Sequence, residues 1–257
     1  MITISILNLK GGVGKTHTAA NMAYELHRRG YKVLLIDNDK QGNLSRTYNR
    51  YNAQEIAPIT KLLSEQYDAG DSKEILQETD YEWLDIITSN MSLFGATWNL
   101  TKEKDVIQIE RYKNFVGWTA VDEVFDYCII DNPPDLGINV VNALMITDEV
   151  IVPVKIDEDA LEGLDIVAGQ IEDAKAFNSR LKLAGVLVTS YQNTDGEAAG
   201  LAWLLEQSAY KVLGVIRYSK KVAESSFMRK PIYEYSPCSA AAQDYKKFVT
   251  KYTGKAR

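Results

Sequence analysis

The sequence predicts an α/β fold built on one doubly wound, mostly parallel sheet with helices on both faces. Apolar, β-branched runs such as 32–37 and 127–131 are continuous, which is typical of strands buried on both sides. These runs alternate with helical patterns along the chain, and this order favours parallel strands joined by crossover helices. With 257 residues the chain can bury one substantial core, so we expect a single domain over 1–257.

The elements follow in order from these patterns. A β-branched run opens the chain, and the first helical pattern repeats small and apolar residues on one face until Gly30 ends it. The predicted strands are 2–8, 32–37, 84–88, 127–131, 149–154, 183–190 and 212–216. The predicted helices are 16–29, 58–66, 138–147, 158–178, 196–210, 219–229 and 238–252. The stretch 44–118 is the least regular, and we expect its aromatic residues Phe94, Trp98, Phe115 and Trp118 to lie in the core rather than to contact a ligand.

The run Lys10-Gly11-Gly12-Val13-Gly14-Lys15-Thr16 separates the first strand from the first helix. Glycines let successive backbone N–H groups converge on one point, and the helix behind them directs its positive end there. Lys15 can then reach the β- and γ-phosphates of a nucleotide, and the Thr16 hydroxyl can ligate Mg²⁺. Strand, glycine-rich loop, lysine and helix all agree, so the sequence predicts a phosphate-binding loop of the P-loop NTPase type.

This loop also departs from the common pattern, which has glycine four residues before the Gly-Lys pair. Here Leu9 occupies that position and Lys10 follows it. A second lysine at the start of the loop is typical of the deviant Walker A group, and the chain resembles the ParA/MinD family of partitioning ATPases over nearly its whole length. The resemblance implies that Lys10 reaches across a dimer to the partner's nucleotide. It also implies that the loop 10–16 and the backbone N–H of His17, which replaces the family's second threonine, contact the phosphates.

Two carboxylates end the second predicted strand, in the run Asp37-Asn38-Asp39-Lys40-Gln41-Gly42-Asn43. The family pattern is Asp-x-Asp-Pro-Gln-Gly-Asn, so only the proline position differs. The resemblance implies that Asp39 orients the water that attacks the γ-phosphate and belongs with Thr16 to the metal site. Asp37 is expected nearer the metal's water shell, and the alternative is that it caps a strand end in solvent.

A third carboxylate, Asp131, ends the strand 127–131 and precedes Asn132-Pro133-Pro134. This stretch resembles the family's Walker B strand and its Asp-x-Pro-Pro switch. The resemblance implies that Asp131 holds Mg²⁺ through water and that 132–134 sense the γ-phosphate. Asn132 stands where the family has a small residue or cysteine, so the tuning of this switch is left open.

Composition restricts the class of protein. The hydrophobic content of 46% and charged content of 25% are those of an ordinary globular chain. No apolar run reaches the roughly 18–20 residues that span a bilayer, and the chain opens on a strand, so we expect neither a membrane span nor a signal peptide. Cys128 and Cys238 form no spaced motif, and His17 and His27 form no metal-ligand cluster. This usage suits a reducing cytoplasm.

The net charge of −6 argues against uniform binding of nucleic acid, but the charge is unevenly distributed. Residues 217–230 carry five basic side chains against Glu224 alone. Such a patch can bind a phosphate backbone, and on charge alone a solvated helix face is the other interpretation. The resemblance favours DNA, with Lys221 as the best match to the family's DNA-contacting position and with Lys220 and Arg217 beside it.

The resemblance therefore implies a ParA-type ATPase that partitions DNA. An ATP-dependent sandwich homodimer would bind double-stranded DNA without sequence preference, and a ParB-like centromere-binding protein would stimulate its weak intrinsic hydrolysis. We expect a cytoplasmic protein that associates with the nucleoid when ATP is bound, and no helix-turn-helix domain before the first strand.

Two other classes of protein are alternatives to a partitioning ATPase. A MinD-like, membrane-recruited ATPase of cell-division siting needs a C-terminal amphipathic helix with a broad apolar face. The tail after 245 holds only a short helical stretch, whose aromatic residues are better explained by packing, so we do not expect membrane binding. A nucleotide-driven electron donor similar to nitrogenase iron protein needs cluster-binding thiolates, and two scattered cysteines do not supply them.

Overall fold

A parallel sheet organises the molecule. The computed structural model describes residues 1–65, 74–102, 106–119, 121–157, 160–206 and 209–254. Within them the strand order is β3-β4-β2-β5-β1-β6-β7-β8. The strands are β1 (Ile2–Ile6), β2 (Val33–Asp37), β3 (Gln77–Glu78), β4 (Leu84–Ile87), β5 (Tyr127–Asp131), β6 (Glu149–Val154), β7 (Lys182–Tyr191) and β8 (Val212–Arg217). All seven predicted strands are present and pair in parallel, which confirms the doubly wound, mostly parallel sheet.

The exception is β3, a two-residue strand that pairs antiparallel with β4 at the edge of the sheet. Its burial is too slight and its length too short to leave a periodic pattern in the sequence, so it was not predicted.

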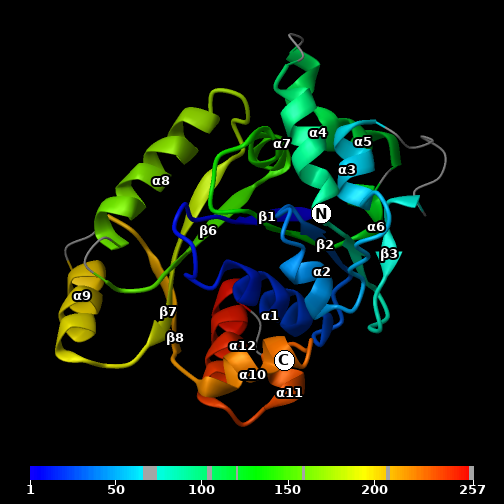
Figure 1. Ribbon diagram of the computed structural model, residues 1–257. Helices are drawn as coiled ribbons and strands as arrows, with labels where there is room; N and C mark the ends of the chain where they lie inside the picture. The colour runs from blue at the N-terminus through cyan, green and yellow to red at the C-terminus, as the bar shows by residue number, and fades with distance from the viewer. Residues whose placement is uncertain (66–73, 103–105, 120, 158–159, 207–208, 255–257) are drawn as a thin grey trace.

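Helices cover both faces of the sheet (Figure 1). One layer holds α1 (Lys15–His27), α2 (Asn43–Thr47), α10 (Lys220–Phe227), α11 (Ile232–Tyr235) and α12 (Ala240–Thr253). The other holds α3 (Pro58–Leu63), α4 (Ser92–Leu100), α5 (Arg111–Thr119), α6 (Val121–Val124), α7 (Ile138–Ile146) and α8 (Ala160–Ala174), with the 3-10 turn η2 (Val106–Ile109) between α4 and α5. Helix α9 (Asp195–Glu206) packs Leu204 into the cluster beside α8. Gly30 has φ 82° and follows α1, as predicted.

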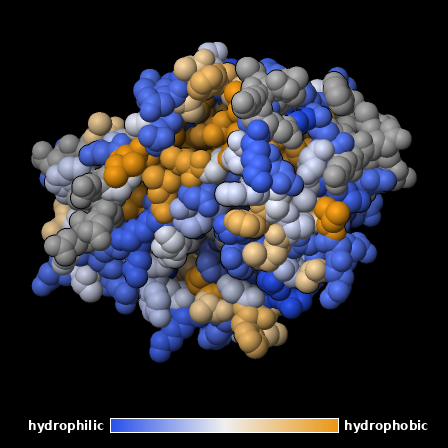
Figure 2. All heavy atoms as spheres, turned by 45° about the horizontal axis from the view of Figure 1, so that its top comes forward, coloured by the Kyte–Doolittle hydropathy of each residue, from blue (hydrophilic) through white to orange (hydrophobic). Residues whose placement is uncertain are grey.

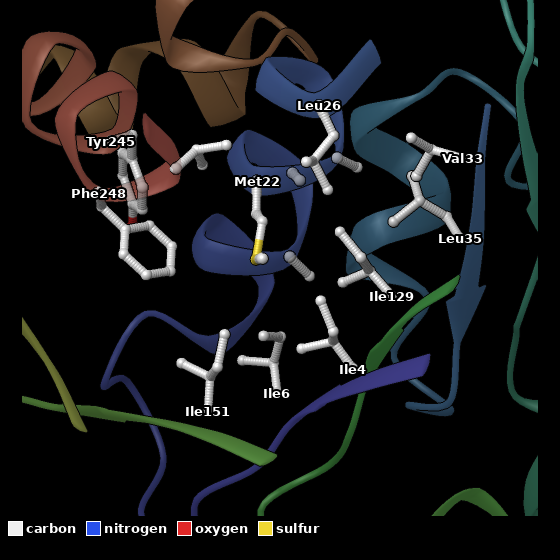
Figure 3. Close-up of a cluster of buried hydrophobic side chains, with 14 of the residues drawn as sticks. Ile4, Ile6, Met22, Leu26, Val33, Leu35, Ile129, Ile151, Tyr245 and Phe248 are labelled. Carbon is white, nitrogen blue, oxygen red and sulfur yellow. The ribbon is translucent and has the colours of Figure 1, made fainter. Parts of the chain in front are cut away.

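The strand period divides the core between the two layers. On β2, Val33 and Leu35 face the cluster under α1 and α12, whereas Leu34 and Ile36 face the cluster under α3, α5 and α7. Figure 3 shows the first of these clusters, in which Met22 of α1 points toward the sheet. Because both faces of β2 are buried, its sequence is apolar without alternation, and this is why it was predictable.

The stretch 44–118 departs from expectation at two of its aromatic residues. Phe115 is buried, as predicted, but Phe94 and Trp98 are more than half exposed, so the prediction that they lie in the core was wrong. Helix α4 buries Leu93, Ala96 and Leu100, which share one face, and positions 94 and 98 lie on another. The side chain of Trp118 lies outside the part of the chain that the structure describes.

Candidate functional site

The glycine-rich loop connects β1, a central strand, to the first turn of α1. Gly12 and Gly14 have φ of 74° and 85°, in the left-handed region that favours glycine. Two side chains hold the loop from outside: Asn8 Oδ1 accepts the Lys10 N–H at 2.9 Å, and the Thr189 hydroxyl of β7 donates to the Val13 carbonyl at 2.8 Å. The first-turn N–H groups of α1 have no intrahelical acceptor, so they are available to an anion.

A cavity of about 620 Å³ lies over this loop, between α1, α2 and α10. Predicted site residues that line it are Gly11, Gly12, Gly14, Lys15, Thr16, His17, Asp39, Arg217 and Lys220. Of the other predicted residues, Val13 and Asp131 lie buried beneath the loop, while Lys10 and Lys221 lie outside the lining. The structure therefore brings together most of the predicted phosphate-binding and metal-binding residues, and it adds two residues that were predicted for DNA.

Lys15 is the buried cation of the site. Only 8% of it is exposed, and its Nζ donates to the Lys10 carbonyl at 3.0 Å. Burial lowers the pKa of Lys15, while the nearby carboxylates of Asp131 and Asp39 act in the opposite direction. A cation held in this way, under glycine N–H groups, suits a polyphosphate.

Asp131 lies behind Lys15 at the end of β5. The residue is 1% exposed, and neither carboxylate oxygen has a hydrogen-bond partner at normal geometry. Burial and the neighbouring Asp37 raise its pKa well above the usual range, and the adjacent Thr16 and Lys15 offset this only in part. A buried carboxylate without a partner, next to a threonine hydroxyl, fits the ligand chemistry of Mg²⁺, which binds one or two carboxylates together with phosphate oxygens and waters.

The strand register places Asp37 of β2 directly beside Asp131 of β5. Asp37 is fully buried, so the interpretation that it caps a strand end in solvent was wrong. Its Oδ2 accepts hydrogen bonds from the Ser45 N–H at 2.8 Å and the Ser45 hydroxyl at 2.7 Å. Burial raises the pKa of Asp37 to about 6, and these bonds oppose the rise. Asp37 therefore anchors α2 beneath the cavity.

Asp39 projects into the cavity from the loop that follows. Its Oδ1 accepts the Gln41 N–H at 2.9 Å, and its own N–H donates to Asp37 at 3.3 Å. Gly42 completes this turn with φ 65°, and a Cβ there would lie 2.7 Å from the Ser89 carbonyl oxygen. The tight turn thus holds the Asp39 carboxylate in front of Lys15 and Thr16.

Lys10 does not reach the cavity of its own subunit. Its Nζ forms an ion pair with Asp157 at 2.6 Å, and both side chains are more than one-third exposed. A solvated pair of this kind contributes little stability, so Lys10 can exchange Asp157 for another anion at low cost.

The candidate DNA residues differ in their surroundings. Arg217 donates to both oxygens of Asp244, at 2.7 and 2.9 Å. Lys221 pairs with Glu224 at 2.6 Å, whereas Lys220 has no ion-pair partner among the described residues. All three remain open to solvent, but the bidentate contact neutralises Arg217 more fully than its neighbours.

The His17 imidazole lies against α10 rather than in the phosphate cradle. Its Nε2 is 3.1 Å from the Ser226 hydroxyl, and burial lowers the pKa of His17. The expected contact between the His17 backbone N–H and a phosphate concerns a ligand and stays a prediction.

Sequence reasoning missed three contributors to the site. Arg46 of α2 lines the cavity, with its guanidinium stacked 3.4 Å from the ring centre of Tyr51. Thr189 supports the loop from β7, and Asn38 lies fully buried between the two carboxylates of its motif. None of these belongs to a recognised pattern; a charged residue three positions after the Gly-Asn pair was the one available signal for Arg46.

A second, apolar groove borders the site. It has a volume of about 450 Å³ and lies between α4 and the loop after β5, lined by Phe94 and Trp98 on one side and Pro133 and Leu136 on the other. Figure 2 views the face that carries α4 and α7 and shows apolar side chains gathered among polar ones. The exposed aromatic pair of α4 therefore belongs to a surface next to the loop that follows Asp131.

Among the described residues, no group of three or more His, Cys, Asp or Glu side chains has the arrangement of a metal cluster. None of the helices described is both long and apolar enough to cross a bilayer.

Comparison with known proteins assigns a family to this geometry. The family described as AAA domain matches residues 1–183. The sporulation initiation inhibitor protein Soj of Bacillus subtilis strain 168 is 34% identical over 249 residues, which cover 94% of each chain. The chromosome partitioning protein ParA of Caulobacter vibrioides is 30% identical over 264 residues, covering 99% of this chain and 94% of the relative. A solved structure from Borrelia burgdorferi B31, named as a plasmid partition protein and bound to AMPPNP, matches with a TM-score of 0.83 at 23% identity, covering 99% of both chains. The chain therefore belongs to the ParA family of partitioning ATPases.

Proposed function

We propose that this protein hydrolyses ATP with Mg²⁺ to drive the partitioning of DNA. The observation that carries the proposal is the cavity itself, in which Lys15, Thr16 and Asp39 surround the space over the glycine-rich loop. The relatives named as chromosome partitioning proteins support the cellular role. A cytoplasmic location, with nucleoid association in the ATP-bound form, and a ParB-like partner follow from the same proposal.

The proposed chemistry uses positioning and charge, as phosphoryl transfer requires. Thr16 and Asp131 would hold Mg²⁺, which supplies positive charge to the β- and γ-phosphate oxygens when bound. Lys15 binds the same phosphates from the side of the loop. Asp39 accepts a hydrogen bond from the attacking water and orients it, while its contact with the Gln41 N–H keeps the carboxylate in place.

The apolar face of α12 bears on the MinD-like alternative. Tyr245, Phe248 and Val249 are buried in the core under α1, as the close-up shows for the first two (Figure 3). The side chains that a membrane-binding helix would insert are thus occupied in the fold, and we propose no membrane role.

Lys10 is predicted to act in trans. The variant Lys10→Ala is expected to bind one nucleotide per monomer with near-normal affinity, because Lys10 lies outside the cavity lining of its own subunit. It is expected not to dimerise, because two facing phosphate clusters repel without a cation between them. Light scattering with a slowly hydrolysed ATP analogue measures this, with Asp157→Ala as the control that frees Lys10 without removing it. A stable ATP-bound dimer of Lys10→Ala would contradict the role.

DNA binding is predicted to require the basic patch on α10 in two copies. Changing Lys220 and Lys221 together to Glu should abolish DNA binding, since phosphate contacts dominate non-specific affinity. Because dimerisation places two patches on one duplex, wild-type binding should need ATP and weaken steeply with salt. Filter binding across a salt series, with and without ATP, measures both effects.

The DNA experiment needs two controls. Lys220 borders the nucleotide cavity, so the ATP affinity of each variant is measured first, and Lys221→Glu alone, outside the lining, should weaken DNA binding without that complication. Lys211→Glu with Lys251→Glu makes the same charge change at a separate cleft and should leave DNA binding within a few-fold of wild type. Equal losses in both double variants would mean that net charge, not the α10 patch, determines binding.

A further inference from the structure

Asn38 stands between Asp37 and Asp39, and each of its backbone and side-chain polar groups forms a hydrogen bond. Its N–H donates to the Asp131 carbonyl at 2.9 Å, and its carbonyl accepts from the Asn139 side chain at 2.9 Å. Its Oδ1 accepts the Tyr112 hydroxyl at 2.7 Å. Its Nδ2 donates to Asn132 Oδ1 at 2.8 Å and to the Asn139 carbonyl at 3.1 Å. A side chain bonded in this way has one available conformation.

The partners of Asn38 are themselves buried. Asn38 is fully buried, Asn132 and Tyr112 are 1% exposed, and Asn139 is 5% exposed. Burial raises the pKa of Tyr112 well above the usual range, so its hydroxyl remains a donor. In such surroundings hydrogen bonds are strong, and a polar group that loses its partner has no water to replace it. The cluster therefore holds one arrangement firmly.

This cluster joins two loops that carry the reacting carboxylates. Asn38 precedes Asp39, and Asn132 follows Asp131, so the amide contact at 2.8 Å links the residue next to each. Asn132 also donates to the Ile6 carbonyl at the end of β1. A small residue or cysteine at 132, as the family pattern has, offers no amide oxygen to Asn38. In this chain the Asn132 side chain supplies that oxygen.

The hydrogen bonds of Asn38 also connect these loops to α5 and α7, in the helix layer on the other face of the sheet from α1. Tyr112 belongs to α5, and Asn139 opens α7. A movement of the Asp39 loop would have to break the contacts of Asn38 with both helices or carry those helices with it.

We propose that Asn38 and Asn132 are positioning residues for ATP hydrolysis, whose amide pair makes the Asp39 loop and the Asp131 loop respond to the γ-phosphate as one unit. Both side chains act through their neighbours and lie outside the cavity lining. Their loss should therefore slow the chemical step without weakening nucleotide binding, because Lys15 and the glycine-rich loop remain.

A double-mutant cycle tests this. Asn38→Ala and Asn132→Ala should each lower kcat between about tenfold and a hundredfold, the range expected when a reacting group is displaced by less than an ångström or so, while KM for ATP stays within threefold. The double variant should be no slower than the slower single variant, since each change removes the same link. Losses that multiply, or single variants with wild-type kcat, would overturn the proposal.

A matched control separates positioning from general stability. Asn142 of α7 is a fully buried asparagine that accepts from the Arg111 N–H and donates to Gln108, without touching either carboxylate loop. Asn142→Ala should lower Tm as much as the other variants but keep kcat near wild type. If it loses as much kcat, the effect of Asn38 and Asn132 is structural and the proposal fails.

The inference rests on the proposed role of Asp39, and the same assay distinguishes the two. Absence of ATP hydrolysis by the wild type would refute the proposed function, and full turnover by Asp39→Ala would refute the proposed role of Asp39. An inactive Asp39→Ala together with wild-type turnover by Asn38→Ala and Asn132→Ala would refute the inference alone.

Discussion

Replacing Lys15 with alanine is expected to abolish ATP binding. Among the predicted phosphate ligands, Lys15 is the one that lines the cavity and carries a full charge. Its Nζ already lies beside the glycine-rich loop, where it donates to the Lys10 carbonyl at 3.0 Å. Charge-assisted hydrogen bonds to two phosphates are worth about 1.5–3 kcal/mol each, so affinity should fall by at least about a hundredfold. Titration with a fluorescent ATP analogue measures the loss.

The loss of ATP affinity in Lys15→Ala should not be caused by unfolding of the variant. Burial lowers the pKa of Lys15, which means that its charge costs free energy in the absence of a ligand. The Tm of Lys15→Ala, measured without nucleotide, checks that the variant is folded. Lys40→Ala, a lysine outside this cavity, serves as the binding control. Affinity within a few-fold of wild type in Lys15→Ala would contradict the assigned role.

Asp39→Ala is expected to bind ATP but lose at least about a hundredfold in hydrolysis, the scale of a general-base contribution. The cradle of Lys15 and the glycines stays intact, so the ground state is spared while the water loses its orientation. The variant should accumulate as an ATP-bound dimer, visible by size exclusion with light scattering. Asp135→Ala is the matched control, because that carboxylate also acts on Lys15 but lies outside the cavity lining. Equal losses in both variants would move the catalytic role away from Asp39.

Local patterns explain what the sequence could predict. The buried strands and the glycine-rich loop depend on residues that are close in the chain, and β2 or the loop 10–16 can be recognised from a few consecutive positions. Phe94 and Trp98 were misplaced because hydrophobic type alone does not say which face of a short helix turns inward.

The contacts that the sequence could not predict join residues far apart in the chain. Asn38 meets Asn132 across 94 positions, and Lys10 meets Asp157 across 147, so neither contact leaves a periodic signal. Amide side chains add to the difficulty, because asparagine is also a preferred residue of turns. The site could therefore be predicted as a list of phosphate and metal residues, but not as a connected assembly.

Gly42 has a consequence for how such chains diverge. Its positive φ, and the 2.7 Å that would separate a Cβ from the Ser89 carbonyl oxygen, make any side chain at 42 costly whether or not ATP is turned over. Asp39 is half-buried in the cavity, and no comparable steric restriction limits which side chain can stand at that position. A descendant that lost hydrolysis would thus be free to replace Asp39 while retaining Gly42. Among relatives we therefore expect glycine at this position with or without hydrolysis, and aspartate three residues earlier where the hydrolysis proposed for Asp39 is retained.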